Sequence, residues 1–134
     1  MEDSIFTKII KGEMPCHKIY EDDKTIAFLD IQPFIEGHTL VVPKVQIDDF
    51  DLLPNEDYRA LFDTVKKVSG RIKHVFGVRK AIVNIMGFEV PHAHIHIMPA
   101  NSEAEYFQAV ENRADIPSEP DNKKLAEIAE RLRF

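Results

Sequence analysis

The stretch Pro91-His92-Ala93-His94-Ile95-His96-Ile97-Met98-Pro99 contains three of the chain's six histidines at alternate positions, separated by small or apolar residues. Residues two apart in an extended strand point to the same face of a sheet. We therefore predict a strand over Val90–Met98 with three imidazoles on one face. Ala93, Ile95 and Ile97 are then expected to pack on the opposite face.

Hydrophobic periodicity outside this stretch predicts further strands and helices. Apolar residues spaced three and four apart predict a long amphipathic helix from about Asn55 to Phe76, which Gly77 is placed to end. Strands joined by short turns, with one long helix inserted late, predict an α+β fold whose five-stranded sheet is mainly antiparallel. The remaining predicted elements are helices near residues 5–10 and after residue 121, and strands over residues 18–20, 25–29, 38–42 and 81–85.

Composition narrows the class of protein. The 134 residues predict a single domain spanning residues 1–134, and the net charge of −6 argues against a nucleic-acid polymer as partner, because neutralising phosphates needs clustered Lys and Arg. No apolar run approaches the roughly 20 residues that span a bilayer, so no membrane partner is predicted. The single cysteine, Cys16, permits no internal disulfide, and the N-terminus lacks the order of a signal peptide. We expect a cytoplasmic protein.

The three alternating histidines are compatible with more than one kind of site. They could be solvated residues on an outward sheet face. They could also bind a metal, since His-x-His on a strand presents two nitrogens to zinc, which takes about four N, O or S ligands. In the third interpretation one imidazole attacks phosphorus while its neighbours orient it or assist the leaving group. The residue pattern alone leaves these alternatives open.

Several segments resemble the histidine-triad (HIT) superfamily of nucleotide hydrolases and transferases. Gly37-His38-Thr39-Leu40-Val41-Val42-Pro43-Lys44 and the stretch His92–Met98 are similar to the two signatures of that family. The segments Ile5–Pro15 and Ala27–Pro33 resemble its N-terminal region. The similarity extends from about residue 4 to residue 99 and is greatest to the branch that cleaves nucleoside phosphoramidates.

The resemblance implies a role for each histidine of the two signatures. His94 matches the family's nucleophile, whose imidazole attacks the α-phosphorus and forms a nucleotidyl-histidine intermediate that water hydrolyses. His96 matches a residue close to the leaving group and the phosphate, and His92 and His38 match supporting histidines. Because His94 must attack unprotonated, activity is expected to fall as the pH drops through about 6 to 7.

The same resemblance implies a nucleotide-binding pocket. Asp30 matches an acidic residue that holds the ribose hydroxyls, and Asn84 matches a residue beside the phosphate. The implied ligand is a purine mononucleotide or nucleotide conjugate, no cofactor is implied, and two subunits are expected to join their sheets in a homodimer. The apolar wall around the base is matched by Ile5, Phe6, Ile9, Phe28, Leu29 and Ile31.

The chain also departs from the family's pattern. Ser4 and Thr7 stand where many bacterial members have a zinc-binding Cys-x-x-Cys, so no metal is predicted. The loop before the triad is shortened and contains Phe88 and Glu89, and this motivates an alternative in which the protein binds nucleotides with little turnover. His17 matches no motif and is predicted to lie on the surface. Residues 101–120 are expected to cover the sheet rather than to line the leaving-group side of the pocket.

Overall fold

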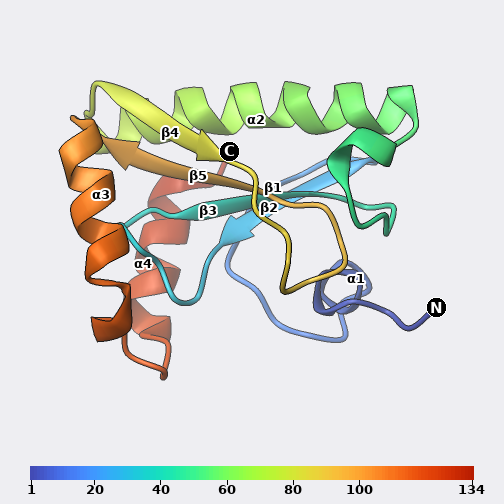
Figure 1. Cartoon of the computed structure of the whole chain (residues 1–134), viewed down its shortest axis with the longest axis horizontal. Helices are drawn as coiled ribbons and strands as arrows, with labels where there is room; N and C mark the ends of the chain where they lie inside the picture. The colour runs from blue at the N-terminus through green and yellow to red at the C-terminus, as the bar shows by residue number, and fades with distance from the viewer.

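The computed structural model describes residues 1–134 and contains a five-stranded sheet of order β1-β2-β3-β5-β4, in which every neighbouring pair is antiparallel. Helices pack around this sheet (Figure 1). This architecture confirms the predicted α+β fold. The strands are β1 (Lys18–Glu21), β2 (Thr25–Leu29), β3 (Thr39–Pro43), β4 (Lys80–Asn84) and β5 (Ile95–Ala100).

The helices agree with the predicted periodicity except in one segment. The long helix spans the predicted residues and ends at Gly77, whose left-handed backbone (φ 62°) suits glycine. Helix α3 was not predicted, because residues 101–120 were assigned no regular structure. No helix combines the length and apolar character needed to cross a membrane. The helices are α1 (Ile5–Ile10), α2 (Asn55–Phe76), α3 (Glu103–Glu111) and α4 (Asn122–Leu132), with short 3-10 turns η1 (Phe50–Leu52) and η2 (Arg113–Asp115).

Side-chain alternation gives the sheet two different faces. Ile95 and Ile97 pack in a buried cluster with apolar residues of α2 and α4, which we call the core face. Phe28 and Leu40 pack with residues of α1 in a second cluster. His96 pairs with Leu40 across the sheet, so it lies on this second face. Helix α1 covers only part of this second face (Figure 1). We call it the pocket face.

Strand β5 begins at Ile95, so the prediction of a strand from Val90 was wrong. The backbone before Ile95 is held by bonds outside the sheet: the Ala93 N–H donates to the Ile47 carbonyl (2.7 Å). The His92 carbonyl accepts from the His94 imidazole (2.8 Å). His96 is therefore the one triad histidine within the strand, and His92 and His94 lie in the segment that leads into it.

Gly37 shapes the loop that carries the fourth histidine. Its φ of +93° is a conformation that other residues rarely adopt, and a Cβ there would lie 2.7 Å from ring carbons of Phe76. The loop then closes on itself, since the Asp30 N–H donates to the His38 carbonyl (2.9 Å). This turn brings Asp30 at the end of β2 beside His38 at the start of β3.

Candidate active site

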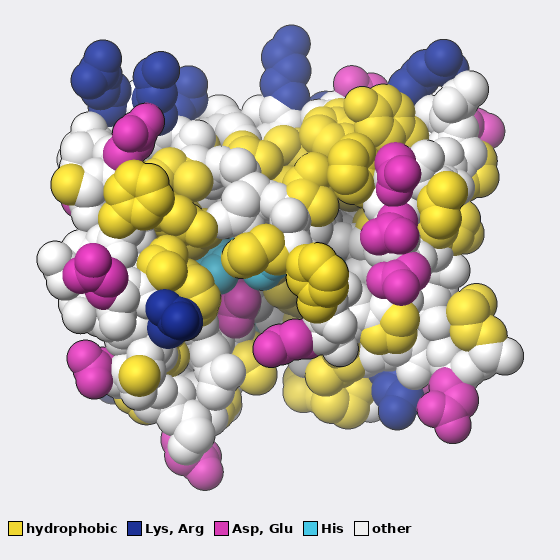
Figure 2. All heavy atoms as spheres, viewed as in Figure 1, with side chains coloured by type: hydrophobic (Ala, Val, Ile, Leu, Met, Phe, Trp, Pro, Cys, Tyr) yellow, Lys and Arg dark blue, Asp and Glu magenta, His cyan; other side chains and the backbone are white.

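A cavity of about 1200 Å³ lies on the pocket face of the sheet. Its lining comes from α1 and the loop after it, the end of β2, the loop before β3, the loop after β4, strand β5 and the segment 106–122. Figure 2 shows histidine side chains near the centre of this face, partly covered by hydrophobic groups. The cavity is thus large, mostly apolar and centred on titratable residues, as ligand sites usually are.

His94 presents an unprotonated nitrogen to this cavity. Its side chain is buried and lines the pocket, and its Nδ1 lies 2.8 Å from the His92 carbonyl oxygen. Since a carbonyl only accepts, Nδ1 of the neutral ring must carry the proton, and Nε2 keeps a free lone pair. No protein group donates to Nε2, and the ring is held edge-on by Phe6 (centroids 5.0 Å apart). The imidazole is therefore oriented with its nucleophilic atom available.

His38 and His96 form a hydrogen-bonded pair beside His94. The Phe34 N–H donates to His38 Nδ1 (3.2 Å), so the His38 proton sits on Nε2 and is donated to His96 Nδ1 (2.9 Å). The neutral His96 ring then keeps a proton on Nε2 as a donor. Burial lowers the pKa of His38 to about 4, and burial followed by the neighbouring histidines lowers the pKa of His96 to about 4. Both rings are accordingly neutral near pH 7.

Asp30 lies next to this pair with part of its carboxylate unused. Oδ1 accepts from the Gln32 N–H (2.9 Å), and Oδ2 lies 3.6 Å from His38 Nε2. Burial raises the pKa of Asp30, against the lowering effect of that backbone bond. A carboxylate at the rim of a pocket with free lone pairs can accept hydrogen bonds from ligand hydroxyls.

His92 lies outside the cavity, although the sequence predicted it on the same strand face as His94 and His96. It is fully buried, its Nε2 donates to the Pro43 carbonyl (2.7 Å), and its Nδ1 accepts from the Ser4 hydroxyl (2.7 Å). Burial lowers the pKa of His92. Both ring nitrogens of His92 are bonded to protein groups, and its carbonyl accepts from His94. His92 therefore positions His94 and does not itself face a ligand.

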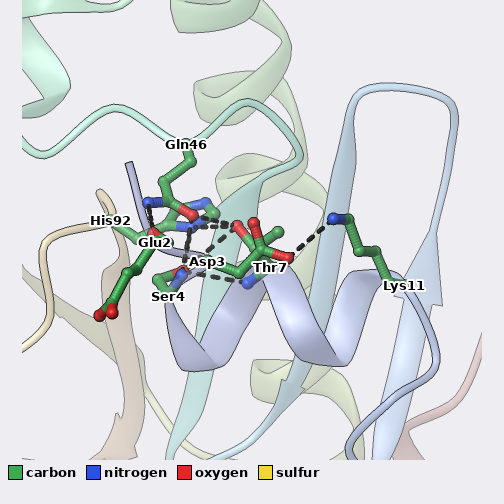
Figure 3. Close-up of polar contacts among 7 residues, drawn as sticks. All are labelled: Glu2, Asp3, Ser4, Thr7, Lys11, Gln46 and His92. Atoms are coloured by element: carbon green, nitrogen blue, oxygen red, sulfur yellow. Dashed lines mark hydrogen bonds and ion pairs between the residues drawn. The ribbon is translucent and has the colours of Figure 1, made fainter.

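Ser4, Thr7 and Gln46 surround His92 in a hydrogen-bonded cluster (Figure 3). Ser4 caps α1 by accepting from the Thr7 N–H (3.0 Å), and the Thr7 hydroxyl donates to Gln46 Oε1 (2.6 Å). The Ser4 N–H donates to the same oxygen (2.8 Å). The cluster ties the start of α1 to the segment that carries His94.

The two places where a metal could be considered do not offer a free set of ligands. At the position of the family's Cys-x-x-Cys the side chains are hydroxyls and an amide already bonded to one another, with one histidine, which does not fit zinc. Donor atoms of Asp30, His38 and His96 lie within 4.8 Å of one another. There, however, His38 Nε2 and His96 Nδ1 are already bonded to each other (2.9 Å). The absence of a metal stays a prediction.

The predicted apolar wall is brought together around the mouth of the cavity. Phe6 and Phe28 form its buried part, while Ile5 and Ile31 are 45% and 50% exposed. Leu29 differs, because the alternation along β2 directs its side chain into the core cluster on the other face. The lining thus includes Ile5, Phe6, Ile9, Phe28 and Ile31, with Leu29 reaching it from the edge of the core.

Several pocket residues were missed. His17, predicted on the surface, is half-buried, lines the cavity and bonds Asn122 (3.0 Å). Residues 101–120, expected only to cover the sheet, contribute Tyr106 and Arg113 to the lining. The Tyr106 hydroxyl accepts from Asn84 Nδ2 (3.0 Å). The available signal was the start of α3, where Ser102 and Glu105 have the spacing of a capping box.

The arrangement has the parts needed for nucleophilic chemistry on an anionic centre. His94 Nε2 can attack, and the His96 Nε2–H can donate to a developing negative charge. Asp30 can accept hydroxyl protons, and aromatic and aliphatic side chains provide a surface for a planar base. Glu89, which would repel an anion, is exposed at the rim of the cavity.

Comparison with known proteins identifies relatives of this fold and site. The family model described as "HIT domain" matches residues 11–103. An uncharacterized HIT-like protein of Methanocaldococcus jannaschii is 41% identical over 81% of this chain and 89% of that protein. The adenosine 5'-monophosphoramidase hnt1 of Schizosaccharomyces pombe is 38% identical over 74% of this chain and 75% of that protein. A crystal structure of a Hit-like protein from Bartonella henselae is 29% identical with a TM-score of 0.81, covering 98% of this chain and 95% of that one.

Proposed function

This chain belongs to the HIT family, and from that premise we propose that it is a nucleotide hydrolase that cleaves purine nucleoside phosphoramidates or related conjugates at the α-phosphorus. The observation that carries the proposal is the free Nε2 of His94, whose tautomer is set by the 2.8 Å bond from Nδ1 to the His92 carbonyl. The similarity to an adenosine 5'-monophosphoramidase supports this choice of bond. The relatives from Methanocaldococcus jannaschii and Borreliella burgdorferi are uncharacterized, and the substrate is part of the proposal.

In the proposed reaction His94 Nε2 attacks the α-phosphorus and a phosphorus–imidazole bond forms. The bond from phosphorus to the leaving nitrogen breaks, and the amine departs after taking a proton from solvent. Water then attacks the nucleotidyl-histidine, releasing the nucleoside monophosphate and restoring the imidazole. The His96 Nε2–H would donate to the phosphoryl oxygens in both steps, since its Nδ1 is occupied by His38.

The remaining pocket residues would hold the nucleoside. The carboxylate of Asp30 would accept the ribose hydroxyls through the lone pairs that Gln32 leaves free. The purine would lie against Phe6, Phe28 and the neighbouring isoleucines. Asn84 would lie beside the phosphate, because it pairs with His96 across β4 and β5.

The alternative is a nucleotide-binding protein with little turnover. It is favoured by the loop before the triad, where Phe88 is fully exposed and Glu89 lies at the rim of the cavity. Calorimetry with adenosine monophosphate and turnover of adenosine phosphoramidate separate the two functions. Binding without turnover supports the alternative, and absence of binding contradicts both.

The covalent intermediate gives the sharpest test of the hydrolase. The protein is mixed with adenosine phosphoramidate, quenched under alkaline conditions that preserve phosphohistidine-type bonds, digested and analysed by mass spectrometry. An adenylyl group is expected on the peptide that contains His94, and on no peptide of His94→Asn. His74→Asn, which removes an exposed histidine of α2, is the matched control and should keep the adduct. Turnover with an adduct elsewhere would contradict the assignment.

The proposal includes a homodimer. Strand β4 is an edge of the sheet, and Val83 (43% exposed) and Ile85 (40% exposed) leave apolar surface beside its unpaired backbone. Such an edge can pair with its copy in a second chain. Light scattering should give about twice the 15.4 kDa mass of one chain, and a monomer at micromolar concentration would contradict this part of the proposal.

A further inference from the structure

The wall of the cavity opposite α1 has no role in the reaction described so far. It consists of α3, η2 and the start of α4, almost entirely beyond the residues that the family model matches. In Figure 1, α3 and α4 lie on one side of the fold and α1 on the other. Tyr106, Val110 and Arg113 lie at spacings of four and three residues, and all three line the cavity. One face of this segment therefore looks into the pocket.

The end of this wall nearest the histidines has polar atoms without partners. Asn84 Nδ2 donates to the Tyr106 hydroxyl, but Asn84 Oδ1 is buried and has no hydrogen-bond partner. The Tyr106 hydroxyl proton is given to no protein acceptor. The Tyr106 hydroxyl lines the cavity and keeps a second lone pair, which can accept from a ligand N–H at this point. A phosphoramidate carries such an N–H on its leaving group.

The other end of the wall carries an unpaired positive charge. Arg113 is the only Lys or Arg among the residues that line the cavity, and no carboxylate lies within 4.0 Å of its guanidinium. Its one hydrogen bond to the protein runs from Nη1 to the Val110 carbonyl (2.6 Å). Figure 2 shows a basic side chain beside the hollow on this face. The remaining N–H groups of the planar guanidinium can bind an anionic group through two parallel hydrogen bonds.

The spacing of these groups describes the ligand. Asn84 pairs with His96 across the sheet, so Tyr106 marks the reacting end of the wall. Arg113 follows seven residues later, in η2 just past the C-cap of α3 at Asn112. Apolar Val110 and Ile116 flank it in the cavity lining. The wall thus matches an N–H, then a carbon chain, then a negative charge.

We propose that this wall is the subsite for the leaving group and that Arg113 binds an anionic group, a carboxylate or a phosphate, at the far end of the leaving amine. The inference rests on the proposed function, because it names the amine that the hydrolase would release. It also goes beyond that function, since neither the triad nor the nucleoside pocket requires a charge on the leaving group.

The test compares three adenosine phosphoramidates whose leaving amines have the same carbon chain and end in a carboxamide, a carboxylate or a phosphate monoester. Arg113→Gln should raise KM about tenfold for one or both anionic substrates and less than twofold for the carboxamide, with kcat little changed. The anionic substrate with the larger effect identifies the ligand. Arg59→Gln removes the same charge from an exposed position on α2 outside the cavity, and its KM values should equal those of the unmodified protein.

Binding keeps the two proposals distinguishable. Affinities for the three conjugates are measured by calorimetry in His94→Asn and in the double variant with Arg113→Gln, where no turnover is needed. If the unmodified protein hydrolyses none of the conjugates, the proposed function fails while the binding comparison still tests the subsite. An equal loss for all three conjugates would place Arg113 on the common phosphate, and no loss would remove it from recognition. Either result overturns the inference.

Discussion

His92 and His94 lie two residues apart in the sequence, yet they differ in how much of their hydrogen-bonding capacity the protein itself uses. Both nitrogens of His92 are bonded, to the Pro43 carbonyl and the Ser4 hydroxyl, and its side chain does not reach the cavity. His94 has one nitrogen bonded and one free toward the cavity. The difference teaches that a satisfied histidine contributes to stability, whereas a histidine with an unused nitrogen is available for chemistry.

The largest expected effect comes from removing the free nitrogen. His94→Asn should lower adenosine phosphoramidate turnover by about a thousandfold or more, because the nucleophile is lost. The free energy of unfolding should change by less than about 1 kcal/mol, since the bond from His94 to the His92 carbonyl is the only one lost. Steady-state kinetics and urea unfolding measure the two quantities. If His94→Asn kept more than a tenth of the activity, the free nitrogen of His94 would not be the nucleophile.

The second prediction concerns His92, whose two nitrogens are both bonded. Its removal should affect stability more than the removal of His94 does. His92→Leu fills a similar volume but removes the hydrogen bonds that His92 makes to the Pro43 carbonyl and the Ser4 hydroxyl. Two buried polar groups that lose their bonds should lower the free energy of unfolding by about 2 to 4 kcal/mol. Urea unfolding at pH 7.5 measures this loss, with His74→Leu on the exposed face of α2 as control. A stability equal to that of the unmodified protein would show that the cluster around His92 is unimportant.

The third prediction uses the pH dependence of the buried pair His38 and His96. Burial lowers their pKa to about 4, whereas a histidine in the unfolded chain titrates near 6.5. Between these values the unfolded chain binds more protons, so the contribution is complete above about pH 6.5 and is lost as the pH falls toward 4. The loss should be on the order of 2 kcal/mol, mostly from the more deeply buried His38. The raised pKa of Asp30 acts in the opposite direction and offsets part of it.

His38→Gln isolates this contribution, because glutamine can accept from the Phe34 N–H and donate to His96 without titrating. Urea unfolding from pH 7.5 to 4.5 should show a shallower decline for this variant than for the unmodified protein. The exposed His74→Gln should keep the original pH dependence. Parallel curves for His38→Gln and the unmodified protein would mean that the His38 charge is not what opposes folding in acid.

The sequence allowed the sheet and the long helix to be predicted, because both depend on local periodicity. Helix α2 spans the predicted residues, and the other predicted strands lie within a residue or two of β1 to β4. The different environments of His92 and His94 could not be predicted, because they depend on partners distant in the chain. Ser4 lies 88 residues from His92, and Pro43 lies 49. No alternation pattern carries that information.

The pocket wall opposite α1 was missed for another reason. Most of α3 is exposed, so it lacks the apolar stripe by which α2 was recognised. The usable signal was its start, where Ser102 accepts from the Glu105 N–H (3.3 Å) and the two residues have the spacing of a capping box. Even with the helix recognised, the direction in which Tyr106 and Arg113 point depends on how α3 packs against the sheet.

The smallest predicted effect separates two roles of Ser4, which caps α1 and donates to His92 Nδ1. Ser4→Thr keeps both roles, Ser4→Asp keeps the cap but cannot donate, and Ser4→Ala loses both. If His92 positions His94 through its carbonyl, activity should fall about tenfold in Ser4→Asp and Ser4→Ala and little in Ser4→Thr. Loss of the cap should lower the free energy of unfolding by about a further 1 kcal/mol in Ser4→Ala, since Ser4→Asp keeps the cap.

Nitrogen chemical shifts of His92 provide a readout that a purely structural role of Ser4 would leave unchanged. With a serine or threonine donor the neutral ring should carry its proton on Nε2, the nitrogen that faces the Pro43 carbonyl. A carboxylate at position 4 should instead hold a second proton on Nδ1, because aspartate accepts and does not donate. A protonated His92 together with reduced turnover in Ser4→Asp would link the cap of α1 to His94. Full activity in Ser4→Asp would show that the reactivity of His94 does not depend on the protonation state of His92.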